Sequence, residues 1–424
     1  MKVRKLINLS LATIGILALT VVGCNNIDDD ILTGDDLALT ELNWIMQNLY
    51  YWNAYVPNVK PLSYKSPMEL MDALTYKTLD KWSYVTTKQE LISYYDEGEF
   101  TGFGFGSSFD SQGTLWISFV FNSSPLYTYG VERGWRIAAI DGTTPTPDNY
   151  GALIGAAQTG VEKRFTFIKP NNEIVETSVT KSVLKMNTVL MDSIYTSGNT
   201  KIGYIVLKGF ITPTRDELNA VFDEFLSKGV NSLILDLRYN GGGSVDVAHR
   251  LANQICGSKA NGELFLKQEH NQNSDSLNKE LYLEPVENTL VLNKLVVIAT
   301  EATASASELI ISGLRPHMNV TVVGDKTYGK PVGMYSLIYP QFNWAFVPIC
   351  FRFVNSQGFS DYYGGIPADI KADDNIRVPF GSITESSLSA ALNHLGYVTT
   401  KTSATPTKAR LNVGKGLYEE IGSW

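Results

Sequence analysis

Ser-Leu-Ile-Leu-Asp-Leu-Arg-Tyr-Asn-Gly-Gly-Gly-Ser, at residues 232–244, is an apolar run that ends in a glycine-rich turn. The run 232–237 has the length and apolar character of a buried strand. The segment 246–256 follows the turn and places Ala248, Leu251 and Ile255 on one helix face. This stretch therefore predicts a strand, a tight turn and a helix in direct succession.

The same alternation continues on both sides of this stretch. Further strands and helices are predicted at 202–207, 214–227, 295–299, 305–314 and 320–323, with two more strand-like runs within 338–354. Strands that alternate with helices form βαβ units, which build a mainly parallel sheet. We therefore predict an α/β domain over residues 186–398.

Two smaller domains are predicted before it, so the chain of 424 residues is expected to be a multidomain α/β protein. In the region 36–97, apolar residues recur at the spacing of one helix face, at Leu42, Ile45, Met46 and Leu49. This predicts a small helical domain that packs on another part of the chain, with a second helix over 67–78. From 98 to 185 the apolar period changes to two, which predicts a β domain.

The first residues have the pattern of a secretory leader. Residues 1–23 combine a basic start with a short apolar stretch. Cys24 follows directly, as in a bacterial lipobox, where the cysteine is lipidated. An uncleaved membrane anchor is the alternative, but the stretch is short for a membrane span. The tether 24–35 is acidic, which resembles a Bacteroidetes surface-export signal and equally suits a solvated linker. We expect a lipid-anchored outer membrane lipoprotein on the periplasmic or the surface face, with the tail 399–424 loosely ordered.

Composition argues against two classes of function. The net charge is −8, and no run of basic residues is present to neutralise nucleic-acid phosphates. Three cysteines and four scattered histidines show no metal-ligand spacing. We therefore expect no nucleic-acid partner, no metal and no cofactor. Cys256 and Cys350 lie in apolar segments and are predicted to be buried free thiols.

Part of the β region resembles the core of a PDZ domain. The resemblance rests on the segments 123–126, 130–131 and 134–142, and on Gly102, Phe103, Gly104 and Phe105, which resemble the carboxylate-binding loop. In a PDZ domain, backbone N–H groups of that loop bind a peptide C-terminus, and the peptide adds to the sheet as a strand. We therefore expect these four residues to bind peptide.

A serine and a lysine stand at two further turns. Ser305 lies in Thr-Ala-Ser-Ala-Ser-Glu, residues 303–308, and Lys330 lies in Thr-Tyr-Gly-Lys-Pro, residues 327–331. A serine hydroxyl is a weak nucleophile that needs a base, and no histidine lies in a comparable motif. A lysine can be that base if desolvation favours its neutral amine. Ser305 would open a helix, where free N–H groups can stabilise an oxyanion.

These motifs, in this order and spacing, resemble the C-terminal processing (tail-specific) serine peptidases of family S41. The resemblance covers residues 100–375 and implies a catalytic domain akin to the ClpP/crotonase fold. It implies that Ser305 is the nucleophile and Lys330 the base, with the N–H groups of Ala306 and Gly242 forming the oxyanion hole. The implied activity is an endopeptidase that cuts a protein or peptide through an acyl-enzyme, after the PDZ-like domain has captured its tail.

Structural roles compete with these assignments. Ser305 and Glu308 also fit a helix capping box, and Ser307 and Thr303 are competing nucleophiles. The glycines at 241–243 are also a plain strand-to-helix turn. Asp236 and Arg238 are interpreted as an ion pair or loop brace in either case.

The chain departs from the family at two positions. Met334 stands where many members have a Gln that orients the lysine, and Gly241 replaces a common Pro. An inactive peptide-binding lipoprotein of the same fold is therefore the alternative function. A crotonase-like acyl-CoA enzyme is a third, which a secreted location and a PDZ-like domain disfavour.

Overall fold

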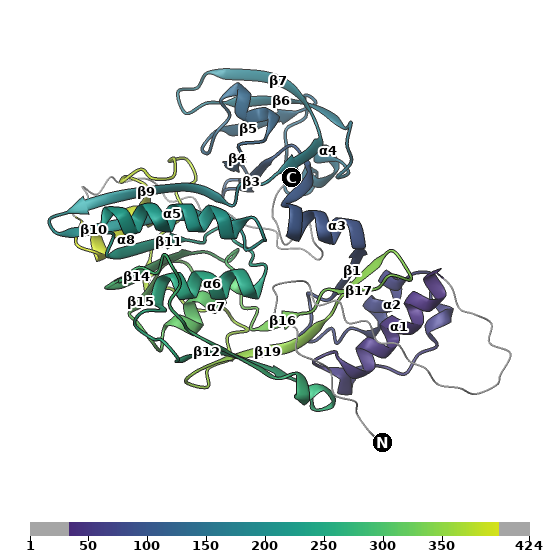
Figure 1. The fold of residues 1–424 in the computed structure, drawn as a ribbon. Coiled ribbons are helices and arrows are strands. Elements are labelled where there is room, and N and C mark those ends of the chain that lie inside the picture. Colours follow the sequence, from purple (N-terminus) through teal and green to yellow (C-terminus); the bar gives the residue numbers. More distant parts are fainter. Residues whose placement is uncertain (1–33, 398–424) are drawn as a thin grey trace, which may run out of the picture.

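The computed structural model describes residues 34–397. The predicted leader 1–23, the lipidation site Cys24, all but the end of the tether and the tail 399–424 lie outside the described residues. Within the described range, no helix has both the length and the apolar character needed to cross a bilayer. The described chain has three parts: a β domain at the top of Figure 1, a larger α/β part below it on the left, and a helical region at the lower right.

The α/β part is built on a six-stranded sheet in the order β20-β15-β14-β11-β10-β9. Its strands are β9 (Val189–Ser197), β10 (Thr200–Leu207), β11 (Ser232–Asp236), β14 (Lys294–Ala299), β15 (Val320–Gly324) and β20 (Ile370–Lys371). All neighbours are parallel except β9, which is antiparallel to β10. The predicted parallel sheet is confirmed, and the long strand β9 is an addition that the sequence did not reveal.

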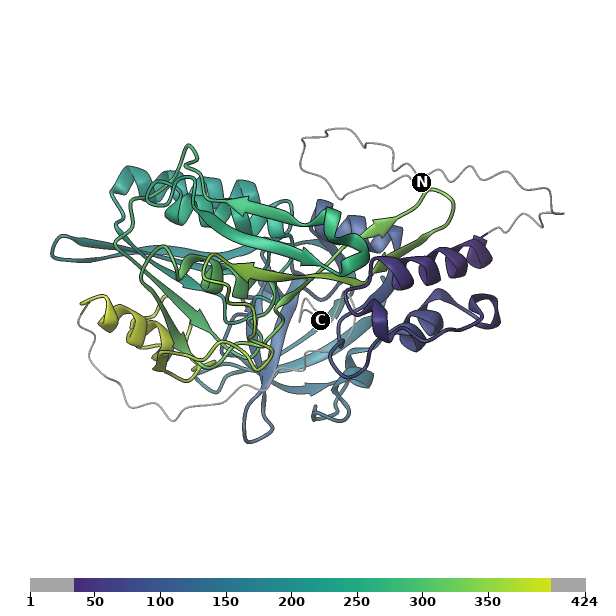
Figure 2. The ribbon, with the colours of Figure 1, turned by 90° about the horizontal axis from the view of Figure 1, so that it is seen from below.

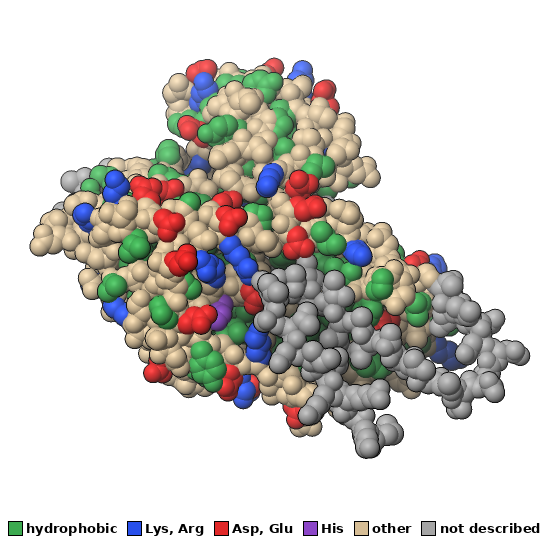
Figure 3. Space-filling view, viewed as in Figure 1, with side chains coloured by type: hydrophobic (Ala, Val, Ile, Leu, Met, Phe, Trp, Pro, Cys, Tyr) green, Lys and Arg blue, Asp and Glu red, His purple; other side chains and the backbone are tan. Residues whose placement is uncertain are grey.

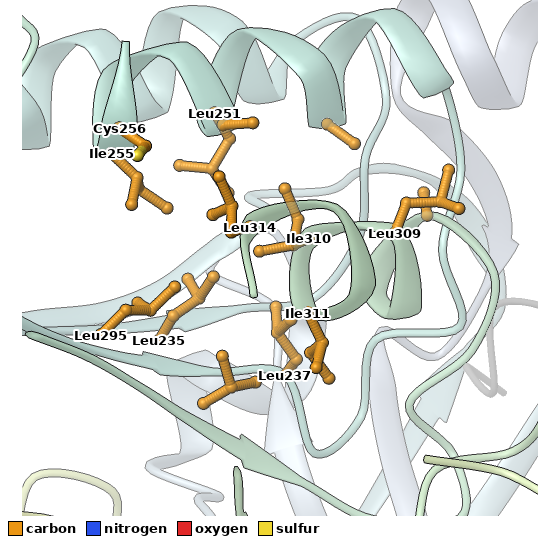
Figure 4. Packing of buried hydrophobic residues seen from close by; sticks show 14 of the residues in the cluster. Leu235, Leu237, Leu251, Ile255, Cys256, Leu295, Leu309, Ile310, Ile311 and Leu314 are labelled. Atoms are coloured by element: carbon orange, nitrogen blue, oxygen red, sulfur yellow. The ribbon is translucent and has the colours of Figure 1, made fainter. Parts of the chain in front are cut away.

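Helices cover both faces of this sheet. On one face lie α5 (Thr214–Lys228), α6 (Val245–Cys256) and α7 (Ala306–Leu314), and α8 (Ser386–His394) packs on the other. Figure 2 shows the yellow helix α8 on the side of the sheet opposite the teal helices. In Figure 4, side chains of α6 and α7, including Leu251 and Ile310, meet those of the sheet, including Leu235 and Leu295. Burial of large aliphatic side chains on both faces stabilises the layers.

A second sheet, in the order β13-β12-β19-β16, extends from the α/β part toward the helical region. Its strands are β12 (Leu264–His270), β13 (Lys279–Tyr282), β16 (Val332–Met334) and β19 (Ile349–Asn355). All of its pairs are antiparallel. The sequence reading placed strands near β19 but missed the hairpin of β12 and β13, whose charged residues weaken the apolar alternation.

The N-terminal helices pack on this extension. They are α1 (Gly34–Asn48) and α2 (Pro67–Leu74), so the second helix is shorter than the predicted 67–78. Their apolar faces bury Leu42, Ile45 and Leu70 against Val332 and Phe346. A small three-stranded sheet joins β1 (Tyr84–Thr87) to β18 (Trp344–Val347) and β17 (Leu337–Ile338). The helical region thus packs on another part of the chain, as predicted.

The β domain is a five-stranded antiparallel sheet in the order β3-β4-β5-β6-β7. Its strands are β3 (Phe105–Phe109), β4 (Leu115–Val120), β5 (Arg136–Ile140), β6 (Glu162–Ile168) and β7 (Ile174–Thr180), with the short helix α4 (Tyr150–Ile154). Strand β2 (Glu99–Gly102) pairs with β8 (Ser182–Lys185), so the first and last strands of the domain lie side by side. The helix α3 (Lys88–Ile92) precedes β2 in the chain. Strand β3 ends the five-stranded sheet, so it has a sheet neighbour on one side only.

Candidate active site

Ser305 lies at the turn between β14 and α7, directly before the first residue of the helix. Its backbone has φ +55° and ψ −118°, a conformation that non-glycine residues rarely adopt. Such backbone strain persists only where the surrounding structure imposes it, and it is frequent at active sites. The side chain is half-buried at the start of α7, where N–H groups and the helix dipole favour negative charge.

The two competing hydroxyls near Ser305 have structural roles. Ser307 is fully buried and its Oγ donates to the carbonyl of Asn240 at 3.0 Å. Thr303 is also fully buried, and its Oγ1 donates to the carbonyl of Leu237 at 2.8 Å. Both hydroxyls hold the loop after β14 against the loop after β11. Ser305 is therefore the candidate nucleophile of this turn.

A buried carboxylate connects the loop of Ser305 (300–305, the serine loop) with the loop of Lys330 (325–331, the lysine loop). Glu308 Oε2 accepts the N–H of Ser305 at 2.9 Å and the N–H of Lys330 at 2.8 Å. Its Oε1 accepts the N–H of Gly329 at 2.7 Å and the hydroxyl of Thr327 at 2.5 Å. Burial raises the pKa of the Glu308 carboxyl above its usual range, although these hydrogen bonds act to lower it. The predicted reach of Glu308 back to Ser305 is present, and the same side chain also fixes the lysine loop.

Lys330 is almost fully buried, with 6% of its surface exposed. Its Nζ lies 3.2 Å from Sδ of Met334 and 5.8 Å from the ring centroid of Trp82. The loop before it is tied to the serine loop by a hydrogen bond from Tyr328 N–H to the Thr303 carbonyl, at 3.0 Å. The two sequence motifs thus meet in space, although 25 residues separate Ser305 from Lys330.

Gly242 and Ala306, the expected oxyanion donors, lie side by side. A Cβ atom on Gly242 would lie 2.8 Å from Cβ of Ser305 and 3.0 Å from the backbone nitrogen of Ala306, so only glycine fits there. The residue has φ +110°, which also favours glycine. In this structure the N–H of Gly242 donates to Oδ1 of Asn240 at 2.9 Å. The glycine run is therefore placed at the site, with one of its N–H groups turned to a side chain.

Asp236 and Arg238 form the ion pair expected from the sequence, within a larger buried network. Arg238 contacts Asp236 at 2.7 Å, Asp374 at 2.8 Å and Glu385 at 2.9 Å, and Arg133 of the β domain contacts Asp374 at 2.5 Å. Burial alone would raise the pKa of Asp374, but Arg133 and Arg238 lower it to about 2. No local motif marks the partners at 133, 374 and 385, so the sequence did not reveal them.

The four residues expected to bind a peptide C-terminus are all buried. The side chains of Phe103 and Phe105 pack on Phe165 in the core of the β domain, with ring centroids 5.1 and 5.8 Å away. Across from β3, the hydroxyl of Tyr150 on α4 lies 2.7 Å from the hydroxyl of Ser107. The aromatic residues of the loop therefore support the fold of the domain, and any contact with a ligand falls to the backbone.

The described residues contain no group of three His, Cys, Asp or Glu side chains placed to hold a metal ion. Cys256 and Cys350 are buried free thiols, as predicted. On the face shown in Figure 3, acidic and basic side chains are interspersed over the described part of the chain.

Known proteins share this architecture. Residues 201–372 match peptidase family S41, and residues 43–84 match the peptidase S41 N-terminal domain. A carboxyl-terminal-processing protease of Picosynechococcus sp. is 30% identical over 215 residues, which are 49% of this chain and 48% of that protein. The carboxy-terminal processing protease CtpA of Bacillus subtilis is 23% identical over 297 residues, which are 69% of this chain and 61% of that protein. The chain thus spans about half to three-fifths of the length of these relatives.

Solved structures agree with these sequence matches at the level of the fold. An S41 protease candidate from Bacteroides fragilis superposes with a TM-score of 0.69 at 22% identity, over 89% of this chain and all of that one. The photosystem II D1 C-terminal processing protease gives 0.50 at 18% identity, over 80% of this chain and 93% of that one. The chain therefore contains a peptidase family S41 domain, preceded by an S41 N-terminal domain.

Proposed function

We propose that the chain is a serine endopeptidase in which Ser305 is the nucleophile and Lys330 the base. The observation that carries the proposal is the shared carboxylate oxygen of Glu308, which fixes the backbones of both residues. Two residues held to one buried, rigid acceptor keep a constant relative position, which nucleophilic catalysis requires.

The reaction would proceed in two steps. Oγ of Ser305 attacks the peptide carbonyl carbon while the Lys330 amine takes its proton. The N–H groups of Ala306 and Gly242 stabilise the oxyanion once that of Gly242 has turned from Asn240 to the substrate. The C–N bond then breaks, the proton passes from Lys330 to the leaving amine, and the acyl group remains on Ser305. Water, deprotonated by Lys330, hydrolyses this ester and restores the enzyme.

The substrate would be a protein or peptide whose tail is captured by the β domain acting as a PDZ-like module. Strand β3 supports this proposal because it ends its sheet, and an extended peptide can add to such an edge. The segment from Gly102 to Phe105 joins the end of β2 to the start of β3 and would receive the terminal carboxylate on its backbone N–H groups.

The site of action would be the cell envelope, with the chain held on the outer membrane by a lipid on Cys24. The lipobox-like end of the leader is the support for this proposal. Metabolic labelling with a radioactive fatty acid, followed by fractionation, tests it. Label in the parent and none in a Cys24→Ala variant is the expected result, and equal label in both contradicts the anchor.

The activity is tested by incubating purified protein with casein and following fragments by mass spectrometry. Cleavage by the parent and none by Ser305→Ala or Lys330→Ala variants with parental melting temperatures is the expected result. Retained cleavage in either variant contradicts the mechanism. If the parent does not cleave and yet binds peptides, the peptide-binding alternative holds, which the engaged N–H of Gly242 favours.

A further inference from the structure

We propose that Met334 and Trp82 are positioning residues that hold the Lys330 amine in place for catalysis. The inference rests on the proposed function and extends it to two side chains outside the Ser305 and Lys330 motifs. One of them belongs to the region that matches the S41 N-terminal domain. That domain would therefore contribute directly to the active site.

Met334 lies beside an irregularity in the pairing of β16 with β19. Gly333 pairs with Phe351 and Met334 with Ile349, so the extra residue of this bulge, Cys350, lies on β19 opposite Met334. A bulge of this kind redirects a side chain, and bulges are common beside active sites. Sδ of Met334 then lies 3.2 Å from Nζ of Lys330, within hydrogen-bonding distance for sulfur.

The thioether has chemistry suited to this position. Sulfur accepts hydrogen bonds weakly and carries no charge, so it can orient the amine without the strong attraction that a carboxylate would exert on an ammonium group. An amide oxygen and a thioether sulfur are both neutral acceptors, so a glutamine at position 334 could perform the same task.

Trp82 contacts the amine from the N-terminal region. Its ring centroid lies 5.8 Å from Nζ of Lys330, within the range of a cation–π contact, and 6.3 Å from the ring of Tyr328 in the lysine loop. The backbone of Trp82 is fixed by its N–H, which donates to Oδ1 of Asp80 at 2.8 Å. Asp80 is itself buried and accepts the hydroxyl of Tyr50 at 2.8 Å. The backbone that carries the indole is thus anchored beside the lysine.

The test uses the purified full-length protein in detergent and compares Met334→Leu with Met334→Gln. Leucine keeps the volume but removes the acceptor, so kcat is expected to fall about tenfold or more with little change in KM. Glutamine restores an acceptor and is expected to recover most of the parental kcat. For the tryptophan, Trp82→Leu is expected to lower kcat by a similar factor, and Trp82→Phe, which keeps an aromatic ring, by less.

Matched controls separate positioning from packing. Met71→Leu and Trp52→Phe change residues of the same apolar cluster and are expected to keep the parental kcat. The proposal is overturned if Met334→Leu has the parental kcat, or if Met334→Gln is as slow as Met334→Leu while both melt like the parent.

A second measurement distinguishes a failure of the positioning role from a failure of the proposed endopeptidase function. A fluorophosphonate probe measures attack by Ser305 alone: an Oγ–P bond forms, fluoride leaves, and the base takes the hydroxyl proton. If casein stays intact in the parent, the proposed endopeptidase function fails, while slower labelling of Met334→Leu still supports positioning. A crystal structure of Met334→Leu in which Nζ of Lys330 keeps its parental place overturns the positioning role whatever the activity.

Discussion

The backbone N–H groups of Ser305 and Lys330 donate to one and the same oxygen, Oε2 of Glu308, at 2.9 and 2.8 Å. The two backbone nitrogens therefore lie no farther apart than the sum of these distances. Because Glu308 is fully buried and lies in the first turn of α7, it links the serine loop to the lysine loop through a rigid helix. A residue that fits a plain capping role in the sequence thereby connects the Ser305 and Lys330 motifs.

Glu308→Gln is expected to lower both stability and activity. The amide has one oxygen for four donors, and its NH2 group must face N–H or O–H donors on one side. Each buried donor left unpaired costs about 1–3 kcal/mol, so the free energy of unfolding should fall by that order. Denaturant unfolding and kcat measure the two effects. Glu301→Gln, at an exposed residue, is the control; equal behaviour of the two variants would contradict the role of Glu308.

Ser305→Gly is expected to be inactive and yet more stable than Ser305→Ala. Both substitutions remove the nucleophile, but alanine keeps the Cβ atom that makes φ +55° with ψ −118° unfavourable. Glycine adopts this conformation freely, at the cost of a more flexible unfolded chain. The balance favours Ser305→Gly over Ser305→Ala by about 1 kcal/mol. Parallel urea titrations of the two variants measure the difference, and a less stable glycine variant would show that the turn is not strained.

The arrangement of the α/β sheet was predictable because its strands are short apolar runs and its helices have clear apolar faces. Residues 232–256 show this best: the strand, the turn and the helix lie within one or two residues of the predicted bounds. The hairpin of β12 and β13 was not predictable, because strand residues such as Lys267, Glu269 and Glu280 are charged and its partner β19 lies some 80 residues later.

The candidate site was only partly predictable for a similar reason. Ser305, Lys330 and Gly242 stand in local motifs, whereas Trp82 reaches the lysine from a distant part of the chain. Local patterns in a sequence do not record such contacts. Met334 was visible as a departure from the family, but its contact with the amine, next to a bulge in β19, is a property of the folded chain alone.

Lys208→Met is expected to stabilise the protein at neutral pH and to flatten its pH dependence. Burial lowers the pKa of Lys208 from 10.5 to about 7, and its Nζ lies 5.6 Å from the ring centroid of Phe119 in the β domain. Between these two values the unfolded chain binds a proton that the folded chain does not, so the parent gains stability as pH rises from about 7 to 10.5.

Below about pH 7 the buried amine is charged and its full cost is present, at about 1.4 kcal/mol per unit of pKa shift. Methionine carries no charge and fills a similar volume, so this cost disappears. Guanidinium unfolding at a series of pH values from 6 to about 10 measures it. A curve for Lys208→Met that runs parallel to that of the parent would show that Lys208 does not titrate on unfolding in this range.

Asp374→Asn is expected to destabilise the chain strongly and to loosen the β domain. Asp374 accepts Arg133 of the β domain and Arg238 of the α/β part, and the Tyr239 hydroxyl also donates to it. Removing one charge from a buried ion network leaves the others uncompensated, which costs about 3–5 kcal/mol. Arg133 connects the β domain to this network. In Asp374→Asn, hydrogen exchange should therefore rise at the contacts between the β domain and the α/β part before it rises within either part.

The pH dependence of the parent gives an independent check of the same network. The pKa of Asp374 is lowered from 3.8 to about 2 in the folded chain, so the unfolded chain binds the proton first as pH falls. The stability that this group contributes is therefore fully present above about pH 4 and is lost as pH falls toward 2. Asp374→Asn removes this contribution, so the stability of the variant should fall less steeply than that of the parent over this range. Acid unfolding curves of equal slope would show that Asp374 is not ionised in the buried network.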